Sequence, residues 1–187
     1  MSDAMQARDG FEMTLDEFFS SEYFLGEGKY EFAAGEIITM MSPAGTDHED
    51  VSAVLIGLFV HFLRGKTCRV YGSNAGLFLW DNEFRIPDMF VVCDPGKISD
   101  NKCVGSPDLV VEIITKWSKN EDIIRKRESY RRAGINEFWI VDLVSKSVVV
   151  ENFHLGVVKR FDLGERVRSW KFESLDFDLY EIFEGIM

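Results

Sequence analysis

Two carboxylates stand where an acidic side chain is unexpected. Glu112 interrupts the apolar run at 109–114, whose pattern is typical of a β-strand covered on both faces. An ionised carboxylate is costly there unless it is paired or bound to a metal ion, although a strand-end glutamate bonded to a neighbouring Lys or Arg is an alternative. Asp88 follows Pro87 at the mouth of another apolar segment, 24 residues before Glu112. Two adjacent strands would bring both carboxylates to one end of a sheet, where paired hard oxygen ligands suit Mg²⁺ or Mn²⁺.

Lys126 is the third residue of chemical interest. It lies on a predicted helix after Glu112, where Ile123, Lys126 and Tyr130 recur at spacings of three and four residues. The lysine therefore shares the inward stripe of that helix. A lysine on such a stripe either meets buried carboxylates or extends past the apolar edge to keep its ammonium in water. Both alternatives stay open on the sequence alone.

Four further polar residues are weaker candidates as functional groups. Asp108 alternates onto the same strand face as Glu112 and could compete with it as an acidic partner. His48 falls in the first turn of a predicted helix, where a lone histidine is more often a capping or surface residue. Glu31 and Glu36 flank a predicted hairpin, and we expect both side chains to be solvated.

Capping signals and hydrophobic periodicity predict the elements that must position these groups. Capping signatures at 14–17, 46–49 and 118–121 predict the starts of three helices, the second reaching about residue 64 and the third about residue 132. Strands are predicted at 29–32, 36–41, 68–71, 76–80, 84–93, 108–114, 138–142, 147–153 and 157–161, and a loop at 97–106.

The strand, helix and strand over 108–142 form a crossover unit, which requires two parallel strands. The chain is therefore predicted to be α/β, with a central mixed β-sheet flanked by helices. An N-terminal hairpin around Ala34 and Gly35 and a C-terminal β-meander are expected in addition. We expect a single domain over 14–183 and a flexible N-terminus over 1–13.

Composition limits the class of protein. Of 187 residues, 46% are hydrophobic and 16 are Phe, which excludes a disordered chain. The longest apolar stretch, 53–63, is shorter than a membrane span of about 20 residues, and the first residues lack the features of a secretory signal. Cys68, Cys93 and Cys103 form no CxxC motif, so we expect free thiols in a cytoplasmic protein and no structural zinc site.

Charge is distributed unevenly along the chain. The 21 basic and 32 acidic residues give a net charge of −11, which argues against tight non-specific binding to DNA. Residues 1–50 carry 2 basic and 12 acidic side chains, whereas 116–132 carry 7 basic and 3 acidic ones, a net of +4. This basic helix face is either an ordinary solvated surface or the path by which phosphates approach, with binding that weakens steeply as salt rises. Its candidate nucleic-acid-binding residues are Arg125, Arg127, Arg131 and Arg132.

Several segments, read together and in order, resemble one nuclease family. Pro87-Asp88, a gap, and then Glu112 in an apolar strand resemble the PD-(D/E)XK nuclease core, and the longer context is similar to its Uma-two branch. The matching segments run from about residue 14 to 183. They are Tyr30-Glu-Phe-x-x-Gly-Glu36, Met41-Ser-Pro43 followed by His48, Arg85-x-Pro-Asp88, Pro107-Asp-Leu-Val-Val-Glu112, Asp122-x-x-x-Lys126-x-x-x-Tyr130-x-x-Ala-Gly134 and Glu137-Phe-Trp-Ile-Val-Asp142.

The resemblance implies a restriction-endonuclease-like fold and a divalent-metal phosphodiesterase site in which Asp88 and Glu112 bind the metal. The lysine of the motif should stand at position 114, where this chain has Ile114. In this family the lysine is moved to the following helix, and Lys126 matches that position. Possible supporting residues are Glu36, His48, Asp108 and Asp122.

The chain also departs from the family pattern. Thr115-Lys-Trp-Ser118 replaces a usual Ser-Pro-Ser-Thr-like stretch, and Leu143 replaces a usual proline. Neither change removes a proposed catalytic group, but Trp117 could alter access to the site.

The sequence thus predicts an endonuclease that uses Mg²⁺ or Mn²⁺, acts on nucleic acid, most simply DNA, and forms a homodimer. Lys126 would orient the attacking water or stabilise charge in the transition state. Two alternatives stay open. One is a catalytically silent binding or regulatory module that keeps the nuclease fold. The other is a protein of acidic interaction surfaces whose main role is oligomerisation.

Overall fold

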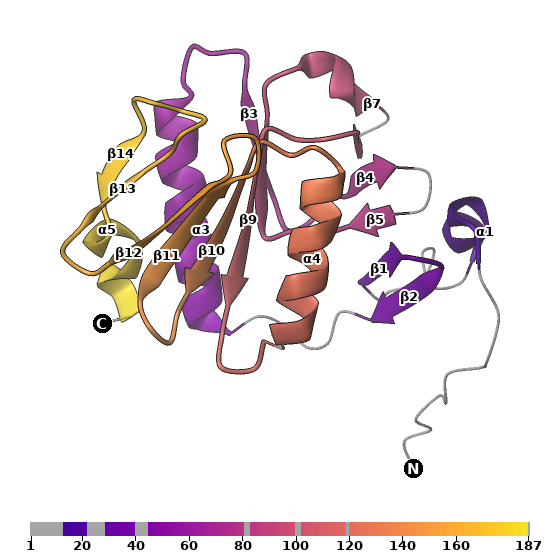
Figure 1. Ribbon diagram of the computed structural model, residues 1–187, viewed down its shortest axis with the longest axis horizontal. Coiled ribbons are helices and arrows are strands. Elements are labelled where there is room, and N and C mark those ends of the chain that lie inside the picture. Colours follow the sequence, from indigo (N-terminus) through magenta and orange to yellow (C-terminus); the bar gives the residue numbers. More distant parts are fainter. Residues whose placement is uncertain are drawn as a thin grey trace.

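A six-stranded mixed sheet lies at the centre of the computed structural model, which describes residues 13–21, 29–39, 45–80, 83–99, 102–118 and 120–186. Strands β9 and β10 run parallel, and the other neighbours in this sheet are antiparallel (Figure 1). The predicted crossover and the predicted mixed sheet are therefore confirmed. The order across the sheet is β12 (Val157–Asp162), β11 (Ser147–Asn152), β10 (Glu137–Asp142), β9 (Leu109–Ile114), β6 (Met89–Val92) and β3 (Arg69–Gly72).

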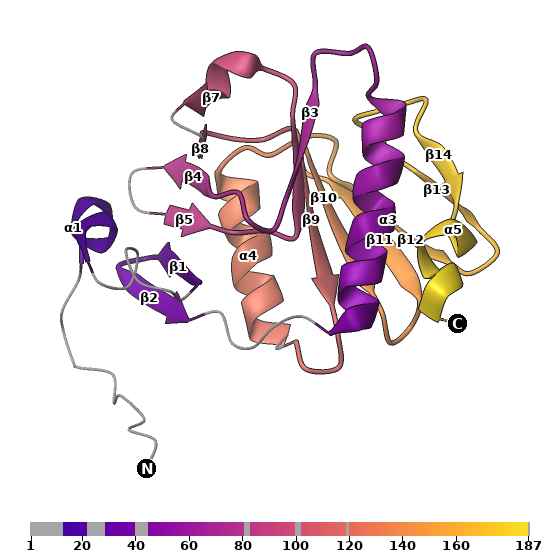
Figure 2. The same ribbon diagram turned by 180° about the vertical axis from the view of Figure 1, so that it is seen from behind.

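Two long helices cover opposite faces of this sheet, as the two views in Figures 1 and 2 show together. Helix α3 packs on one face with the C-terminal elements, and α4 packs on the other. The helices and the C-terminal strands are α1 (Leu15–Ser20), α3 (Thr46–Phe62), α4 (Asn120–Arg132), β13 (Arg166–Arg168), β14 (Asp176–Asp178) and α5 (Tyr180–Phe183), with 3₁₀ turns at Pro95–Lys97 and Glu184–Ile186.

Alternation along β9 decides which helix each of its side chains meets. Leu109, Val111 and Ile113 are buried in the core that contains the apolar stripe of α3. Val110 points the other way, into a second core that includes Tyr130 of α4. Because Glu112 shares the face of Val110, its carboxylate is directed at α4.

A second sheet holds the N-terminal hairpin. Strands β1 and β2 turn at Ala34 and Gly35, which both have positive φ (+52° and +81°), as predicted for this hairpin. Phe18 of α1, Phe32 and Phe84 form a small separate core that fastens helix and hairpin together. The order across this sheet is β2 (Glu36–Thr39), β1 (Tyr30–Ala33), β5 (Glu83–Arg85), β4 (Leu77–Trp80), β8 (Lys102–Val104) and β7 (Ile98–Ser99).

The predicted strand at 84–93 is wrong as a single element. It is β5 and β6, which belong to different sheets. Pro87 cannot donate a ladder hydrogen bond, so the chain passes from one sheet to the other there. The predicted loop at 97–106 is also wrong, because it contains β7 and β8, and β8 pairs in parallel with β4. The short strands carried too little periodicity to be read from the sequence.

Helix starts were only partly predicted. The capping box of Thr14 and Glu17 is present. The cap predicted at Thr46 is wrong, because Gly45 is the N-cap of α3 and no side chain caps it. The Ser118 hydroxyl accepts a hydrogen bond from the Thr115 N–H at 2.9 Å rather than from the helix, and residue 119 lies outside the described residues, as do 40 and 41 of the predicted second strand.

The expectation of free thiols is wrong for two of the three cysteines. Cys68 and Cys93 form a disulfide with an S–S distance of 2.07 Å. They lie opposite each other because the antiparallel pairing of β3 with β6, which joins Arg69 to Val92, continues by one residue. Cys103 is free and buried. Cysteine usage therefore gives no support for a reducing compartment. In the parts of the chain that the structure describes, no helix is long and apolar enough to span a membrane.

Candidate active site

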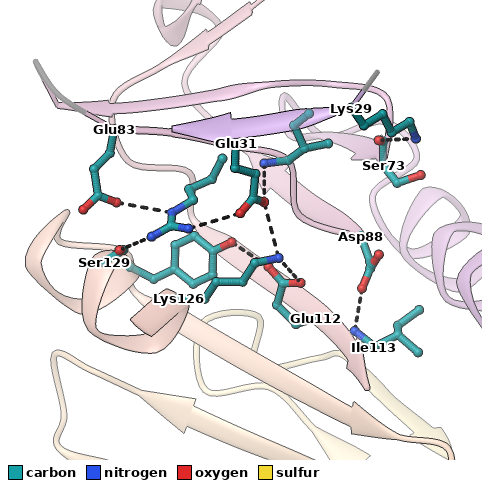
Figure 3. A network of polar contacts seen from close by, with 12 residues as sticks. Lys29, Glu31, Ser73, Glu83, Asp88, Glu112, Ile113, Lys126 and Ser129 are labelled. Carbon is teal, nitrogen blue, oxygen red and sulfur yellow. Dashed lines mark hydrogen bonds and ion pairs between the residues drawn. The ribbon is translucent and has the colours of Figure 1, made fainter. Parts of the chain in front are cut away.

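Asp88 and Glu112 face each other across β6 and β9. The antiparallel register pairs Met89 with Val111, and one further step along both strands sets Asp88 opposite Glu112. Residues in such positions have Cβ atoms about 5 Å apart. Asp88 is anchored there, because its Oδ2 accepts the Ile113 N–H at 2.7 Å (Figure 3). The register therefore brings Asp88 and Glu112 to neighbouring positions on adjacent strands, as expected, and their binding of one shared ion stays a prediction.

Helix α4 supplies two partners for Glu112. The Lys126 ammonium lies 3.0 Å from Glu112 Oε2, and the Tyr130 hydroxyl donates to Oε1 at 2.6 Å (Figure 3). The spacing of four residues stacks Lys126 and Tyr130 on the helix face that packs against β9. Lys126 is 6% exposed and Glu112 is 4% exposed. Lys126 therefore meets buried carboxylates, and the alternative that it extends into water is excluded.

Glu31 is a member of this cluster that the sequence did not reveal. Its Oε1 lies 3.3 Å from the Lys126 ammonium and accepts the Ile86 N–H at 3.0 Å. The expectation of a solvated side chain is wrong, since Glu31 is 1% exposed. The cause is tertiary: β1 pairs with β5, and this pairing carries the hairpin over α4. Glu36 is exposed, as expected.

Arg85 holds the second sheet and α4 together around Glu31. Its guanidinium contacts Glu31 Oε2 at 3.1 Å, Glu83 at 3.3 Å and the Ser129 hydroxyl at 3.0 Å (Figure 3). A buried arginine requires acidic partners. The apolar residues around Arg85 in the sequence indicated that it is buried, and Glu31 could have been anticipated as its partner for that reason. The cluster contains four carboxylates (Glu31, Glu83, Asp88, Glu112) and two buried cations (Arg85, Lys126), and Arg132 contacts Glu83 from its edge.

His48 belongs to the cluster as well. Its Nε2 lies 3.2 Å from Asp88 Oδ1, and the side chain is buried. The hydrogen bond to Asp88 raises the pKa of His48, against the opposing effect of burial. The expectation of a capping or surface residue is wrong. Burial of His48 could have been predicted from its position three residues before Val51, which places it on the buried stripe of α3.

Asp108 and Asp122 have different relations to the site. Asp108 accepts the Cys93 N–H at 2.7 Å and lies 2.8 Å from the Lys171 ammonium, so it stabilises the far end of β9 rather than competing with Glu112. Asp122 lies in the first turn of α4, and its charge helps to raise the pKa of Lys126.

Burial and neighbouring charges shift the pKa values of Glu112, Lys126 and Tyr130. Burial raises the pKa of Glu112 to about 7; Asp88 and Glu31 add to this, and Lys126 opposes it. Burial alone would lower the pKa of Lys126, but Glu112 and Glu31 outweigh it, so the pKa lies above its usual value. Lys126 thus remains an ammonium at neutral pH and cannot act as a base. Burial and the charge of Glu112 also raise the pKa of Tyr130, which stays a donor.

Most of the basic face of α4 is engaged within the chain. Arg127 forms a two-pronged pair with Glu151, and Arg131 forms one with Glu128. Arg132 contacts Glu83 at 3.3 Å. Among the described residues, Arg125 has no carboxylate within ion-pair distance and is exposed. A phosphate would therefore have to displace acidic partners at three of the four arginines.

The carboxylates of the cluster fit Mg²⁺ better than Zn²⁺ or Ca²⁺. The described residues include no group of three or more His, Cys, Asp or Glu side chains arranged to hold an ion. A closed zinc or calcium cage is therefore absent from the described part of the chain. Mg²⁺ is bound through one or two carboxylates while it keeps several waters and substrate oxygens. Asp88 and Glu112 match that need.

The chain is similar in sequence and in fold to known proteins. Residues 15–169 match the Uma2 family, described as "Putative restriction endonuclease". An uncharacterised protein, slr1290 of Synechocystis sp. (strain ATCC 27184 / PCC 6803 / Kazusa), is 25% identical over 164 residues, which are 84% of this chain and 85% of that protein. The crystal structure of a putative nuclease belonging to DUF820 from Anabaena variabilis ATCC 29413 is similar with a TM-score of 0.78 and 19% identity, over 94% of this chain and 99% of that one. The structural likeness supports the restriction-endonuclease-like fold.

Proposed function

Because this chain belongs to the Uma2 family, we propose that it is a metal-dependent endonuclease that hydrolyses phosphodiester bonds at the cluster around Glu112. The observation that carries the proposal is the pair of opposed carboxylates with a buried ammonium 3.0 Å from one of them. Burying charges of both signs is costly, and a fold that needed only stability would be served as well by apolar residues. Perturbed acids and bases of this kind cluster at functional sites.

Asp88 and Glu112 would hold the divalent ion, Mg²⁺ or Mn²⁺. Such an ion supplies a lowered pKa for water and polarises a phosphoryl oxygen. Asp88 is oriented for this by the Ile113 N–H and by His48, and Glu112 by Tyr130. Each carboxylate oxygen has a second lone pair that these hydrogen bonds do not use, and a metal ion could accept it.

Lys126 acts as a fixed positive charge. Its raised pKa rules out proton abstraction at neutral pH, which leaves stabilisation of the charge that develops on the phosphoryl oxygens. Glu31 and Arg85 are positioning residues: Glu31 contacts the ammonium, and Arg85 fixes Glu31. The hairpin thus determines where the lysine points.

The finer expectations remain part of the proposal. The substrate is nucleic acid, with DNA as the first choice. The protein works in the cytoplasm, and it acts as a homodimer, since symmetric dimers are the commonest soluble assemblies.

The test is a plasmid-nicking assay with Mg²⁺, Mn²⁺ or EDTA. We expect hydrolysis with either ion and none in EDTA, and its loss in Asp88→Asn and Glu112→Gln. The control is Glu173→Gln, an exposed carboxylate away from the cluster. Calorimetric titration of Mn²⁺ into each protein gives a second readout, and Asp88→Asn should weaken Mn²⁺ binding even where cleavage is not measured.

A wild-type protein that cleaves nothing with either ion, yet binds nucleic acid, would contradict the proposal. That outcome would assign the chain to the silent binding or regulatory module. Retained cleavage in Glu112→Gln would contradict the assignment of the site while leaving the activity standing.

A further inference from the structure

The loop between β9 and α4 displays an exposed tryptophan. Trp117 is 80% exposed, although a tryptophan normally buries most of its surface. Its neighbours Lys116 and Ser118 are also exposed and polar, so the ring is no part of a continuous apolar patch within the loop. An isolated, fully displayed aromatic ring is better suited to stacking on one flat group than to docking a protein surface.

Hydrogen bonds within the loop order the backbone that carries the ring. The Trp117 N–H donates to the Thr115 hydroxyl at 3.2 Å, and the Thr115 N–H donates to the Ser118 hydroxyl at 2.9 Å. The Ser118 N–H donates to the Thr115 carbonyl at 3.0 Å. The ring is therefore presented by an ordered turn, which lowers the entropy lost when a ligand stacks on it.

The position of the loop connects it to the site. Trp117 is five positions after Glu112, so the two Cα atoms are at most about 18 Å apart. The loop leaves the strand that carries Glu112 and enters the helix that carries Lys126. The Lys116 ammonium lies 4.9 Å from the centre of the Trp117 ring. A cation beside an aromatic face matches a nucleotide, in which a phosphate adjoins a flat base.

We propose that Trp117 stacks on an unpaired nucleobase and that Lys116 contacts a neighbouring phosphate, so the substrate is single-stranded or locally unpaired nucleic acid. The inference rests on the proposed function, because it takes nucleic acid as the ligand. In a duplex the faces of the bases are covered by their neighbours, and an aromatic side chain reaches them only after unstacking. Since three α4 arginines are paired internally, base stacking supplies affinity that phosphate contacts do not.

The test measures binding of the full-length protein in EDTA, so that no strand is cut. The probes are a labelled single-stranded thymidine oligonucleotide, an abasic strand with the same number of phosphates, and a duplex of equal length. Wild type should prefer the thymidine strand to the other two. Trp117→Ala should weaken binding to it about 5- to 100-fold and leave the abasic strand unchanged, with Trp117→Phe between them. Lys116→Ala should weaken binding to the thymidine and abasic strands alike.

Two matched measurements complete the design. Leu155→Ala removes a comparably exposed apolar side chain at the opposite end of the sheet and should bind as wild type does. Intrinsic fluorescence should be quenched by the thymidine strand in wild type and not in Trp117→Ala.

Unchanged affinity in Trp117→Ala, an equal loss for thymidine and abasic strands, or no binding by wild type would each overturn the inference. A shift from dimer to monomer in Trp117→Ala with unchanged affinity would assign the loop to a second copy of the chain and overturn it too. Failure of the proposed function can be distinguished from failure of this inference. If the wild-type protein prefers the thymidine strand through Trp117 but never cleaves with Mg²⁺ or Mn²⁺, the proposed hydrolysis is contradicted and the stacking site stands.

Discussion

At the scale of single residues, the site is an arrangement of charges that stabilise one another only as a set. Lys126 has Glu112 at 3.0 Å and Glu31 at 3.3 Å, and Glu112 has the Tyr130 hydroxyl in addition. Removing one partner of a buried ion pair leaves the other uncompensated, which is more damaging than replacing both. Variants should therefore be chosen to keep shape while changing charge.

Lys126→Met keeps the length of the side chain and removes its charge. We expect hydrolysis to fall by about 100- to 1000-fold, the usual effect of losing one group that stabilises the transition state. Stability should fall by about 3 kcal/mol, because Glu112 and Glu31 lose their shared cation. The measurements are cleavage rates and urea unfolding, with the exposed Lys159→Met as control. Full activity in Lys126→Met would remove the lysine from the mechanism.

Glu112 predicts a pH dependence of stability. Burial first, and then Asp88 and Glu31, raise its folded pKa to about 7, above an unfolded value of about 4.3. The folded state then binds the proton more tightly, so this contribution to stability is fully present below the unfolded value and is lost as pH rises through 7. In EDTA, the stability of wild type minus that of Glu112→Gln should fall by about 1–3 kcal/mol between pH 5 and pH 8. A difference that rises with pH would show that Lys126 dominates and that the carboxyl is ionised throughout.

At the scale of elements, the fold depends on how the C-terminal segment is fastened to the central sheet. Glu137, at the start of β10, is 0% exposed and accepts hydrogen bonds from the Trp139 ring N–H and the Ser169 hydroxyl, both at 2.7 Å. It also accepts the backbone N–H groups of Trp170 and Lys171, at 2.8 and 2.9 Å. Lys171 in turn reaches Asp108, which directly precedes the first residue of β9. Glu137 thus holds the C-terminal segment against the parallel pair of strands.

Glu137→Ala should lower the free energy of unfolding by about 3 kcal/mol or more, since four donors lose one acceptor in a buried place. Glu137 lies away from the cluster around Glu112, so the cleavage rate of the folded fraction should stay within about twofold of wild type. Chemical unfolding and a nicking assay at low temperature measure the two quantities. The exposed Glu173→Gln is the control. A large loss of activity without a loss of stability would place Glu137 in the catalytic machinery instead.

At the scale of the whole molecule, the net charge of −11 and the internal pairing of the α4 arginines both weaken the electrostatic attraction for nucleic acid. The logarithm of the binding constant falls with the logarithm of salt by about 0.7 to 0.9 for each phosphate neutralised. With Arg125 of α4 and Lys116 of the preceding loop as exposed cations, that number should be about two, so binding should weaken modestly with salt rather than steeply as the sequence predicts. The measurement is oligonucleotide affinity from 50 to 300 mM NaCl. Arg125→Glu should lower the slope by about one, and a slope steeper than about five would show that the paired arginines are released to phosphate.

Much of the architecture followed from local patterns, for a physical reason. The strand at Leu109–Ile114, the helix to Arg132 and the strand at Glu137–Asp142 were predictable because burial on both faces, or on one stripe, is written into consecutive residues. The same periodicity predicted that Lys126 faces inward. The energetic cost of a lone carboxylate in a buried strand indicated that Glu112 has a functional role. These effects depend on neighbours in the sequence, so the sequence by itself determined them.

The tertiary structure alone decided the remaining features. Glu31 is buried because β1 pairs with β5, some fifty residues away, and no local pattern contains that pairing. His48 meets Asp88 only once α3 lies on the sheet, and Cys68 meets Cys93 only through the register of β3 with β6. Arg127 was predicted to face phosphate, yet Glu151 of β11 engages it. In each case contacts between distant segments set the surroundings of the side chain. For the charged groups, those surroundings decide whether the group is a ligand, a member of an ion pair or a solvated side chain.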